Sequence, residues 1–196
     1  FAMNWTDPRT NEFTEGFKEK GFLPEAFINM LAVLGWNDGS GQEIFTKEEL
    51  VEKFSMDRVH SSGAKFDYEK AKWFNHEWIK RIGDEVIVKE LKNKNPQYVD
   101  GKLHEIAQLV KDRCTLLTDI WPNSYFFFET PGEADIDAIK PKWNDAKTAF
   151  FNEVISMFNA EPGWNGHELE NKFKELAAAK NIKPGEVLLP LRIMLV

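Results

Sequence analysis

The chain has 196 residues, of which 42% are hydrophobic and 13% aromatic, so it can bury a real core and is not a disordered tail. Its single cysteine, Cys114, excludes an intramolecular disulfide. The apolar runs are far shorter than the roughly 20 residues of a membrane span, and the sequence has no pattern of a secretory signal. We therefore expect a cytoplasmic protein without membrane contacts. The formal net charge of −7, taken alone, argues against a nucleic-acid partner, because lysine and arginine contacts to phosphate supply most of that affinity.

The chain beyond residue 20 has the pattern of an all-α protein. Pro24 suits the first turn of a helix that ends at Gly35. Thr46 and Glu49 form a capping box ahead of a second helix, and Asp67 can cap a third helix over residues 68–81. The apolar positions are Phe27, Ile28, Leu31 and Leu34 in the first helix, and Ala71, Phe74, Trp78 and Ile79 in the third.

Four further helices are predicted in the second half of the chain. They span residues 102–120, 134–158, 166–180 and 184–196. Pro122 should end the first of them, Pro141 should kink the second or mark its true start, and Pro190 should kink the last. Only short β candidates exist, for example residues 125–129. Joints between parts of the fold are predicted near residues 82–84 and 161–166.

No set of residues in the sequence indicates catalysis. The four histidines are scattered, without HExxH or CxxC spacing, so we expect no metal site. The sequence has no glycine-rich phosphate-binding motif. Cys114 follows Arg113, which lowers a thiol pKa in some proteins, but no histidine close in sequence is available as a base. A packed cysteine is the better interpretation.

Basic residues in the middle of the chain are better candidates, as binding residues. Residues 61–115 carry 11 basic and 9 acidic side chains and are the only third of the chain with a positive net charge. Lys72 and Lys80 lie on the helix predicted over 68–81, and Lys65 lies in the loop that leads into it, where it could meet a phosphate backbone. The alternative is that these lysines only solvate the helix.

Two arginines differ from these lysines in their surroundings. Arg113 lies amid leucine and valine side chains, so we expect a packed stem and a directed guanidinium that reads a base edge or a phosphate. An ion pair with Asp112, Asp119 or another carboxylate is the competing interpretation. Arg192 is the only charged residue after Glu186, and such an arginine either forms an ion pair or faces a ligand.

A series of short motifs follows one another over roughly 60 residues of the first half of the chain. They are Gly21–Ala26, Leu34–Trp36, Glu43–Phe45, Arg58–Val59, Phe66–Asp67, Lys72–Trp73 and Asn75. Each motif alone is weak, but in their order and gaps they resemble bacterial glutamyl-tRNA synthetases in the region that follows the active site of those enzymes. The likeness continues more faintly through Arg113–Leu116, Phe126–Phe128 and Pro190–Arg192.

The resemblance implies an all-α fold, with a helical stem-contact region followed by an α-helical anticodon-binding cage. It implies three parts: residues 1–82 as the end of the catalytic part and the stem-contact region, 83–162 as a first anticodon-binding subdomain, and 163–196 as a second, truncated one. In the family, the arginine that matches Arg113 helps to read the last anticodon base, and the one that matches Arg192 lies near the same loop. Lys65, Lys72 and Lys80 would then position the tRNA stem.

The parent enzyme that the resemblance implies is a class I ligase that attaches glutamate to its tRNA with ATP and magnesium. This chain contains no HIGH-type or KMSKS-type motif, so we expect a tRNA-binding fragment, inactive alone, with no cofactor of its own. Its partner would be glutamate-specific tRNA, without DNA, and it would be a monomer. The alternatives are a helical protein–protein interaction module without RNA binding and a diverged stand-alone domain that acts on other RNA.

The sequence departs from the family pattern in two places. The loop Arg58–Lys65 lacks the Ser-Lys-Ser-Pro pattern, which suggests that the basic contact has moved to Lys65. The family's Gly-Pro segment beyond Arg192 is absent. Because the chain opens on Phe1 and ends on an apolar Ile193–Val196, we expect it to be part of a longer protein.

Overall fold

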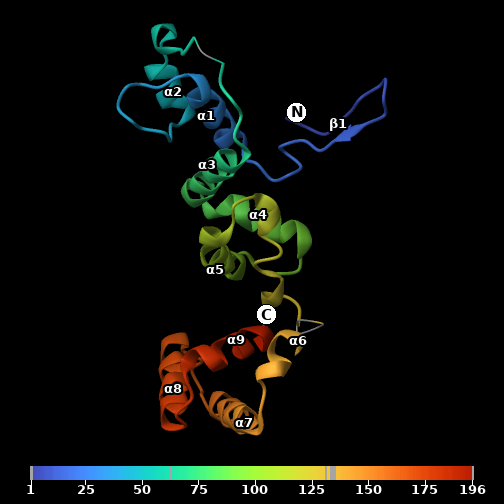
Figure 1. Cartoon of the computed structure of the whole chain (residues 1–196), viewed down its shortest axis with the longest axis vertical. Coiled ribbons are helices and arrows are strands. Elements are labelled where there is room, and N and C mark those ends of the chain that lie inside the picture. Colours follow the sequence, from blue (N-terminus) through green and yellow to red (C-terminus); the bar gives the residue numbers. More distant parts are fainter. Residues whose placement is uncertain (1, 62, 131, 133–135, 196) are drawn as a thin grey trace. The chain divides into compact units, whose positions relative to one another are not determined.

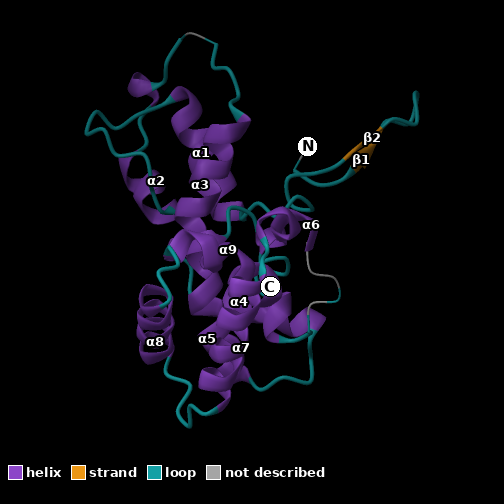
Figure 2. Cartoon of the chain, turned by 60° about the horizontal axis from the view of Figure 1, so that its bottom comes forward, coloured by secondary structure: helices purple, strands orange, loops and turns teal. Residues whose placement is uncertain are grey.

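The structure is a computed structural model of the chain and consists mainly of helices, which confirms the predicted all-α class (Figures 1 and 2). The residues that it describes are 2–61, 63–130, 132 and 136–195. They fall into two compact units, Phe1–Phe128 and Glu129–Val196. Within the described ranges, no helix is long and apolar enough to cross a membrane.

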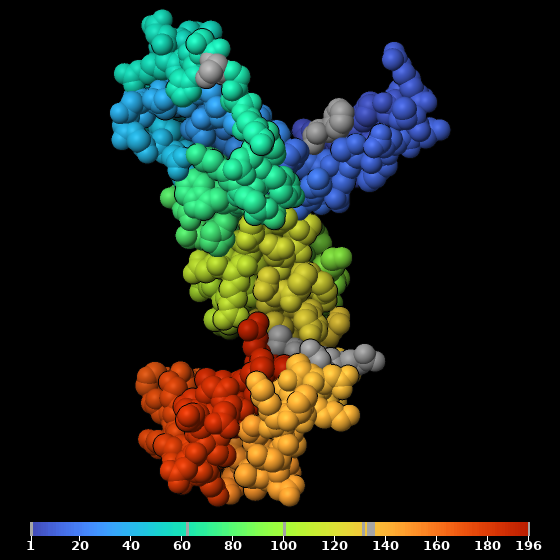
Figure 3. Space-filling model, viewed as in Figure 1, coloured from blue at the N-terminus to red at the C-terminus, as the bar shows by residue number. Residues whose placement is uncertain are grey.

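A short β-hairpin precedes the helices of the first unit, and the sequence pattern does not predict it. Its strands β1 (Trp5–Thr6) and β2 (Phe13–Thr14) pair antiparallel. Asp7 closes the turn, because its backbone N–H and C=O both bond across it, and Asn11 adopts a φ of 56° there. Asparagine tolerates this left-handed conformation better than most residues. The hairpin stands away from the helices of its own unit (Figures 2 and 3).

Helices α1 (Pro24–Gly35) and α3 (Tyr68–Arg81) pack against each other in the first unit. Asp67 caps α3, as predicted, since its Oδ1 accepts the backbone N–H groups of Glu69 and Lys70 at 2.9 and 3.1 Å. One face of α3 is buried and is the predicted one. It comprises Ala71, Phe74, Trp78 and Ile79, together with Asn75.

The buried face of α1 differs from the predicted one. Ile28 and Leu31 are about half exposed, whereas Asn29 is fully buried. The Oδ1 of Asn29 accepts the backbone N–H of Phe45 and the indole N–H of Trp78, each at 3.0 Å. A buried amide must keep its hydrogen bonds, so Asn29 turns toward the core and sets the rotation of α1. The apolar spacing alone does not carry this information.

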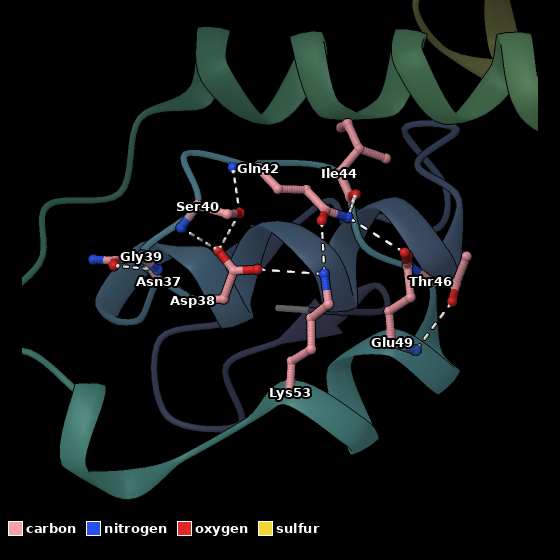
Figure 4. Close-up of polar contacts among 9 residues, drawn as sticks. All are labelled: Asn37, Asp38, Gly39, Ser40, Gln42, Ile44, Thr46, Glu49 and Lys53. Atoms are coloured by element: carbon pink, nitrogen blue, oxygen red, sulfur yellow. Dashed lines mark hydrogen bonds and ion pairs between the residues drawn. The ribbon is translucent and has the colours of Figure 1, made fainter.

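Helix α2 (Lys47–Lys53) is tied to the loop before it by polar contacts (Figure 4). The predicted capping box is present: Thr46 Oγ1 accepts the Glu49 N–H at 3.1 Å, and the Glu49 carboxylate accepts the Thr46 N–H at 2.8 Å. At the far end of α2, Lys53 donates to the Asp38 carboxylate at 3.3 Å. A 3₁₀ turn, η1 (Met56–Arg58), follows.

Helices α4 (Asp84–Lys94) and α5 (Asp100–Val110) complete the first unit as an adjacent pair. Their facing side chains form one core with residues of α1 and α3. Its fully buried members include Ile79, Ile87, Leu91, Leu103, Ala107 and Cys114.

The helix predicted over 102–120 is wrong beyond Val110. The 3₁₀ turns η2 (Lys111–Arg113) and η3 (Leu117–Asp119) replace it. The carboxylate of Asp119 accounts for the break, because its Oδ2 accepts the N–H groups of Thr115 and Leu116 at 2.9 and 2.8 Å. Those N–H groups therefore cannot continue the helix.

The predicted strand over 125–129 is wrong as well. A 3₁₀ turn, η4 (Tyr125–Phe127), occupies this stretch. The backbone N–H groups of Phe127 and Phe128 are bonded within the turn, so they are not available to a strand partner. The aromatic side chains pack together instead, with Trp121 stacked on Phe128 at 5.7 Å between ring centroids.

The second unit contains helices α6 (Ile136–Ile139), α7 (Asp145–Asn159), α8 (Gly166–Ala179) and α9 (Pro184–Leu195). Figure 3 shows its surface in orange and red. Its core is separate from that of the first unit and consists of Phe150, Phe151, Val154, Phe173, Ala177 and Val187.

The predicted helices of the second unit are confirmed over 166–180 and, up to Leu195, in the last segment. The helix predicted over 134–158 is two helices, separated by a 3₁₀ turn at Lys140–Lys142 (η5) that contains Pro141. Asn144 then starts α7, since its side chain accepts the Lys147 N–H at 3.0 Å. Residues 134, 135 and 196 of the predicted helices lie outside the described residues.

Candidate nucleic-acid interface

The outward face of α3 carries two of the predicted binding residues. Because the opposite face is buried in the core, Lys72 and Lys80, eight residues apart, both lie toward solvent. Between them lies Trp73, which is 41% exposed. A cationic face with an exposed aromatic ring is suited to phosphates and to the faces of unstacked bases.

Both lysines are paired with glutamates of their own helix. Lys72 lies 2.9 Å from Glu69, and this hydrogen bond raises the pKa of Lys72 above its usual range. Glu77 accepts from Lys80 and Arg81, each at 2.7 Å, and these hydrogen bonds lower the pKa of Glu77 to about 2. Exposed ion pairs of this kind contribute only about 0–1 kcal/mol. A phosphate can therefore take the place of the carboxylate.

Lys65 lies on a different part of the first unit. It is exposed and lines a pocket of about 300 Å³ whose floor is formed by side chains of α1 and α3, including Met30 and Phe74. Within the described part of the chain, no hydrogen bond or ion pair involves its ammonium group. The predicted stem-contact lysines thus differ: Lys65 is unpaired, whereas Lys72 and Lys80 are paired.

Arg113 ends the 3₁₀ turn η2 and is exposed, so the predicted packing of its stem is wrong. The helix α5 ends before Arg113, and Leu109, one of the residues expected to pack around it, lies on the outward face of α5 and is 60% exposed. The competing ion pair is also not formed with any residue that the structure describes. Asp119, one of the candidate partners, is occupied by backbone N–H groups. No donor of the guanidinium is therefore used by a residue within the described ranges.

A groove of about 540 Å³ lies between α3 and the segment that follows Arg113. Lys72, Trp73 and His76 line it from α3, and Thr115 and Leu116 line it from the other side. Trp73 and His76 are not among the binding residues predicted from the sequence. Their spacing from Lys72 places them on one side of the helix, but no sequence signal links them to a segment about 40 residues away.

Cys114 directly precedes Thr115 in the chain, belongs to the core of the first unit and is unreactive. Its side chain is fully buried, and burial raises its thiol pKa to about 11. At neutral pH it is therefore a thiol and not a nucleophilic thiolate. The interpretation as a packed cysteine is confirmed, although it lies just beyond a 3₁₀ turn and not in a helix.

Arg192 belongs to the second unit, on α9. Its side chain is exposed, and it makes no ion pair with the residues that the structure describes there. Val187 and Pro190 of the same helix are buried. Of the two interpretations from sequence, a structural ion pair is therefore not observed, and the guanidinium is accessible to a ligand.

Two family models match the chain. Residues 66–196 match the "Anticodon binding domain", and residues 7–73 match "tRNA synthetases class I (E and Q), catalytic domain". The first match includes α3, Arg113 and Arg192, and covers more than half of the chain. The second ends within α3.

Curated relatives and solved structures agree with these matches. The chain is 36% identical to a glutamate–tRNA ligase of Cytophaga hutchinsonii and 37% identical to one of Flavobacterium johnsoniae, over its whole length and 39% of each relative. A crystal structure of a glutamate tRNA ligase from Elizabethkingia meningosepticum, in complex with its amino acid, superimposes with a TM-score of 0.85 at 35% identity. This chain covers 40% of that ligase. A glutamate–tRNA synthetase from Elizabethkingia anophelis superimposes with a TM-score of 0.79 at 34% sequence identity.

The chain thus spans about two fifths of the length of the glutamate–tRNA ligases that it matches. The solved structure superimposes over the whole of this chain, and the anticodon-binding family model covers residues 66–196. The chain belongs to the anticodon-binding domain family and is homologous along its whole length to glutamate–tRNA ligases.

Proposed function

We propose that this chain binds and positions tRNA within a glutamate–tRNA ligase. The match of residues 66–196 to the anticodon-binding domain family carries this proposal, since both candidate arginines lie inside the matched segment. The accessible guanidinium of Arg113 supports it, since Arg113 comes two residues before Thr115, which lines the groove together with Lys72 and Trp73. The net charge of −7 is unevenly distributed: residues 61–115 carry 11 basic and 9 acidic side chains, although Glu69 and Asp119 also line the groove.

In this proposal the residues divide by task. Lys65, Lys72 and Lys80 contact phosphates of the tRNA stem, which fixes position without reading sequence. Arg113 reads the last anticodon base, and Arg192 contacts the same loop from the second unit. A guanidinium can donate two parallel hydrogen bonds to a base edge, and an unstacked anticodon base exposes that edge.

The whole protein would be a monomeric, cytoplasmic class I ligase that attaches glutamate to its tRNA. ATP with magnesium would activate the amino acid, and the residues of this chain would hold the tRNA. The chain contains no HIGH-type or KMSKS-type motif, so we propose that it contributes binding and specificity but no covalent chemistry.

The test is a binding titration of the full chain against a glutamate-tRNA transcript and a copy with the last anticodon base exchanged, at two salt concentrations. Arg113→Ala should reduce the discrimination between the two by about 1–3 kcal/mol, the cost of one lost bidentate base contact. Lys65→Ala should weaken both tRNAs alike and reduce the salt slope by about one, because it removes one phosphate contact.

Arg9→Ala is the matched control, since Arg9 is an exposed arginine in the hairpin turn, away from the groove. It should change neither the discrimination nor the salt slope. Equal losses on both tRNAs in Arg113→Ala would contradict a reading role for this residue. Absence of salt-dependent binding to either tRNA would contradict the proposed function.

A further inference from the structure

Helix α3 holds the segment after Arg113 through a fully buried asparagine. Asn75 Oδ1 accepts the Leu23 N–H at 2.7 Å, and its Nδ2 donates to Thr115 O at 2.7 Å and to Gly21 O at 3.3 Å. The bond from Leu23 fixes which end of the amide is the acceptor. One side chain of α3 therefore joins two separate stretches of backbone, the segment 21–23 and the segment at Thr115, to the helix.

The next residue of α3 makes a second bond to the same segment. His76 Nδ1 lies 2.8 Å from Cys114 O. Because a carbonyl oxygen only accepts, Nδ1 carries the hydrogen in this bond. Neighbouring side chains of one helix thus hold two consecutive carbonyl groups, those of Cys114 and Thr115, which come directly after Arg113.

Gly21 closes the arrangement from the other side. Its carbonyl also accepts the Leu117 N–H at 2.9 Å, and its φ is 92°. A Cβ at Gly21 would lie 2.7 Å from the backbone nitrogen of Thr118, so only glycine permits this approach. The segment 114–118 is therefore held both by α3 and by the backbone that leads into α1.

Arg113 itself has no such anchor. Its guanidinium is exposed and bonds to no residue that the structure describes, so its direction depends on the backbone that carries it. That backbone is fixed at the two following carbonyl groups. The same helix carries Lys72 one turn before His76, on the groove that Thr115 and Leu116 line from the other side.

We propose that Asn75 and His76 are positioning residues for base recognition: by holding the carbonyls of Cys114 and Thr115, they set Arg113 in register with the stem-contacting face of α3. The proposal rests on the proposed function, because it requires that Arg113 reads a base. In this proposal α3 has two functions: it carries the lysines that contact the tRNA stem, and it positions the arginine that reads the base. Precise placement matters because a bidentate contact tolerates little displacement.

His76 is the residue to change, because it is half-buried, whereas loss of the buried Asn75 amide leaves backbone groups unpaired in the core. His76→Leu removes the donor. His76→Asn keeps an N–H donor at the same distance along the side chain as Nδ1. His104→Leu is the matched control: His104 also lies on a helix of the first unit, and its ring bonds to Glu85.

The measurement is the ratio of the affinities of the full chain for the glutamate-tRNA transcript and its anticodon-exchanged copy. His76→Leu should lower this ratio about three- to tenfold, as expected for one lost hydrogen bond, with His76→Asn restoring most of it and His104→Leu leaving it unchanged. A uniform loss on both tRNAs, or no rescue by His76→Asn, would overturn the proposal.

The double variant His76→Leu with Arg113→Ala separates positioning from direct contact. If His76 acts through Arg113, the double variant discriminates no worse than Arg113→Ala alone. Additive losses would mean that His76 acts independently, and they would overturn the proposal. If Arg113→Ala leaves the discrimination intact, the proposed function of Arg113 in base reading is wrong, and the positioning proposal falls with it. If Arg113→Ala reduces the discrimination but His76→Leu does not, only the positioning proposal is wrong.

Discussion

The cations of α3 lie close to acidic side chains, and this pairing determines how much positive charge the helix offers to RNA. Glu77 pairs with both Lys80 and Arg81, and Glu69 pairs with Lys72. Affinity for a polyanion depends on counterions released when cations meet phosphates, so a paired lysine releases fewer than an unpaired one. Lys65 and Arg113, which lack such partners among the described residues, should carry more of the electrostatic affinity.

Removal of the Glu77 carboxylate tests this idea. Glu77→Gln leaves Lys80 and Arg81 without their shared partner, so tRNA should bind more tightly at low salt, and the slope of log K against log salt should steepen by about one. Titrations of the full chain with the glutamate-tRNA transcript at several salt concentrations measure both quantities. The anticodon-exchanged copy should respond equally, since phosphate contacts carry no sequence information.

Glu105→Gln serves as the control for net charge. Glu105 is an exposed residue of α5 that also loses one negative charge in this variant, but no hydrogen bond or ion pair in the described ranges links it to a cation. Its slope should match that of the wild type. The same steepening in both variants would show that net charge, and not the release of two specific cations, governs binding.

At the scale of elements, α2 depends on a small set of polar contacts because it buries little. Leu50, at 8% exposure, is its one buried side chain, and Val51 is 77% exposed. A seven-residue helix is too short to be stable alone, so its caps and side-chain contacts matter more than its packing. Figure 4 shows that these contacts join both ends of α2 to the loop before it, through Thr46 and Lys53.

Thr46→Ala should therefore destabilise the first unit by about 1 kcal/mol, the usual cost of a lost N-cap. Thr46→Ser keeps the hydroxyl that accepts the Glu49 N–H and should restore nearly all of the loss. Urea unfolding followed by circular dichroism measures the free energy of unfolding of the three proteins. Equal stability of Thr46→Ala and Thr46→Ser would mean that the cap contributes nothing to this helix.

Helix starts could be predicted from the sequence, whereas helix ends and buried faces could not. Thr46, Asp67 and Pro24 act within their own turn, so the local sequence is sufficient. The end of α5 depends on Asp119, which accepts the N–H groups of residues three and four positions before it, and the rotation of α1 depends on what Asn29 meets in the core. The Asp119 contact is local and the Asn29 contacts are tertiary, but neither leaves a periodic signal in the sequence.

The candidate site, like the helices, could be predicted from the sequence only in part. The positions of Lys65, Lys72 and Arg113 along the chain follow from composition and the family motifs, but their partners do not. The groove forms because His76 meets Cys114, 38 residues away, and Asn75 meets Thr115, 40 residues away. The sequence predicts that the stem of Arg113 packs among leucine and valine side chains, because it gives no sign that α5 ends before this residue.

At the scale of the whole molecule, the chain consists of two units with separate cores. Each hydrophobic cluster among the described residues lies within one unit. The second unit spans only residues 129–196, and a domain of that size has a stability of only a few kcal/mol. Single large-to-small changes in its core should therefore unfold it while the first unit keeps its structure.

Phe173→Ala is such a change. Phe173 is 2% exposed and packs edge-on against Phe150 at 5.3 Å between ring centroids, so its removal should cost about 3–5 kcal/mol. Hydrogen exchange measured by mass spectrometry should then show faster exchange across α7, α8 and α9, with unchanged protection in α3 and α5. Ile155→Ala, at a residue of the same unit that is 57% exposed, should leave exchange unaltered. Faster exchange in α3 as well would mean that the two cores unfold together. A core substitution in the second unit would then remove the proposed stem contacts of α3 together with the proposed contact of Arg192.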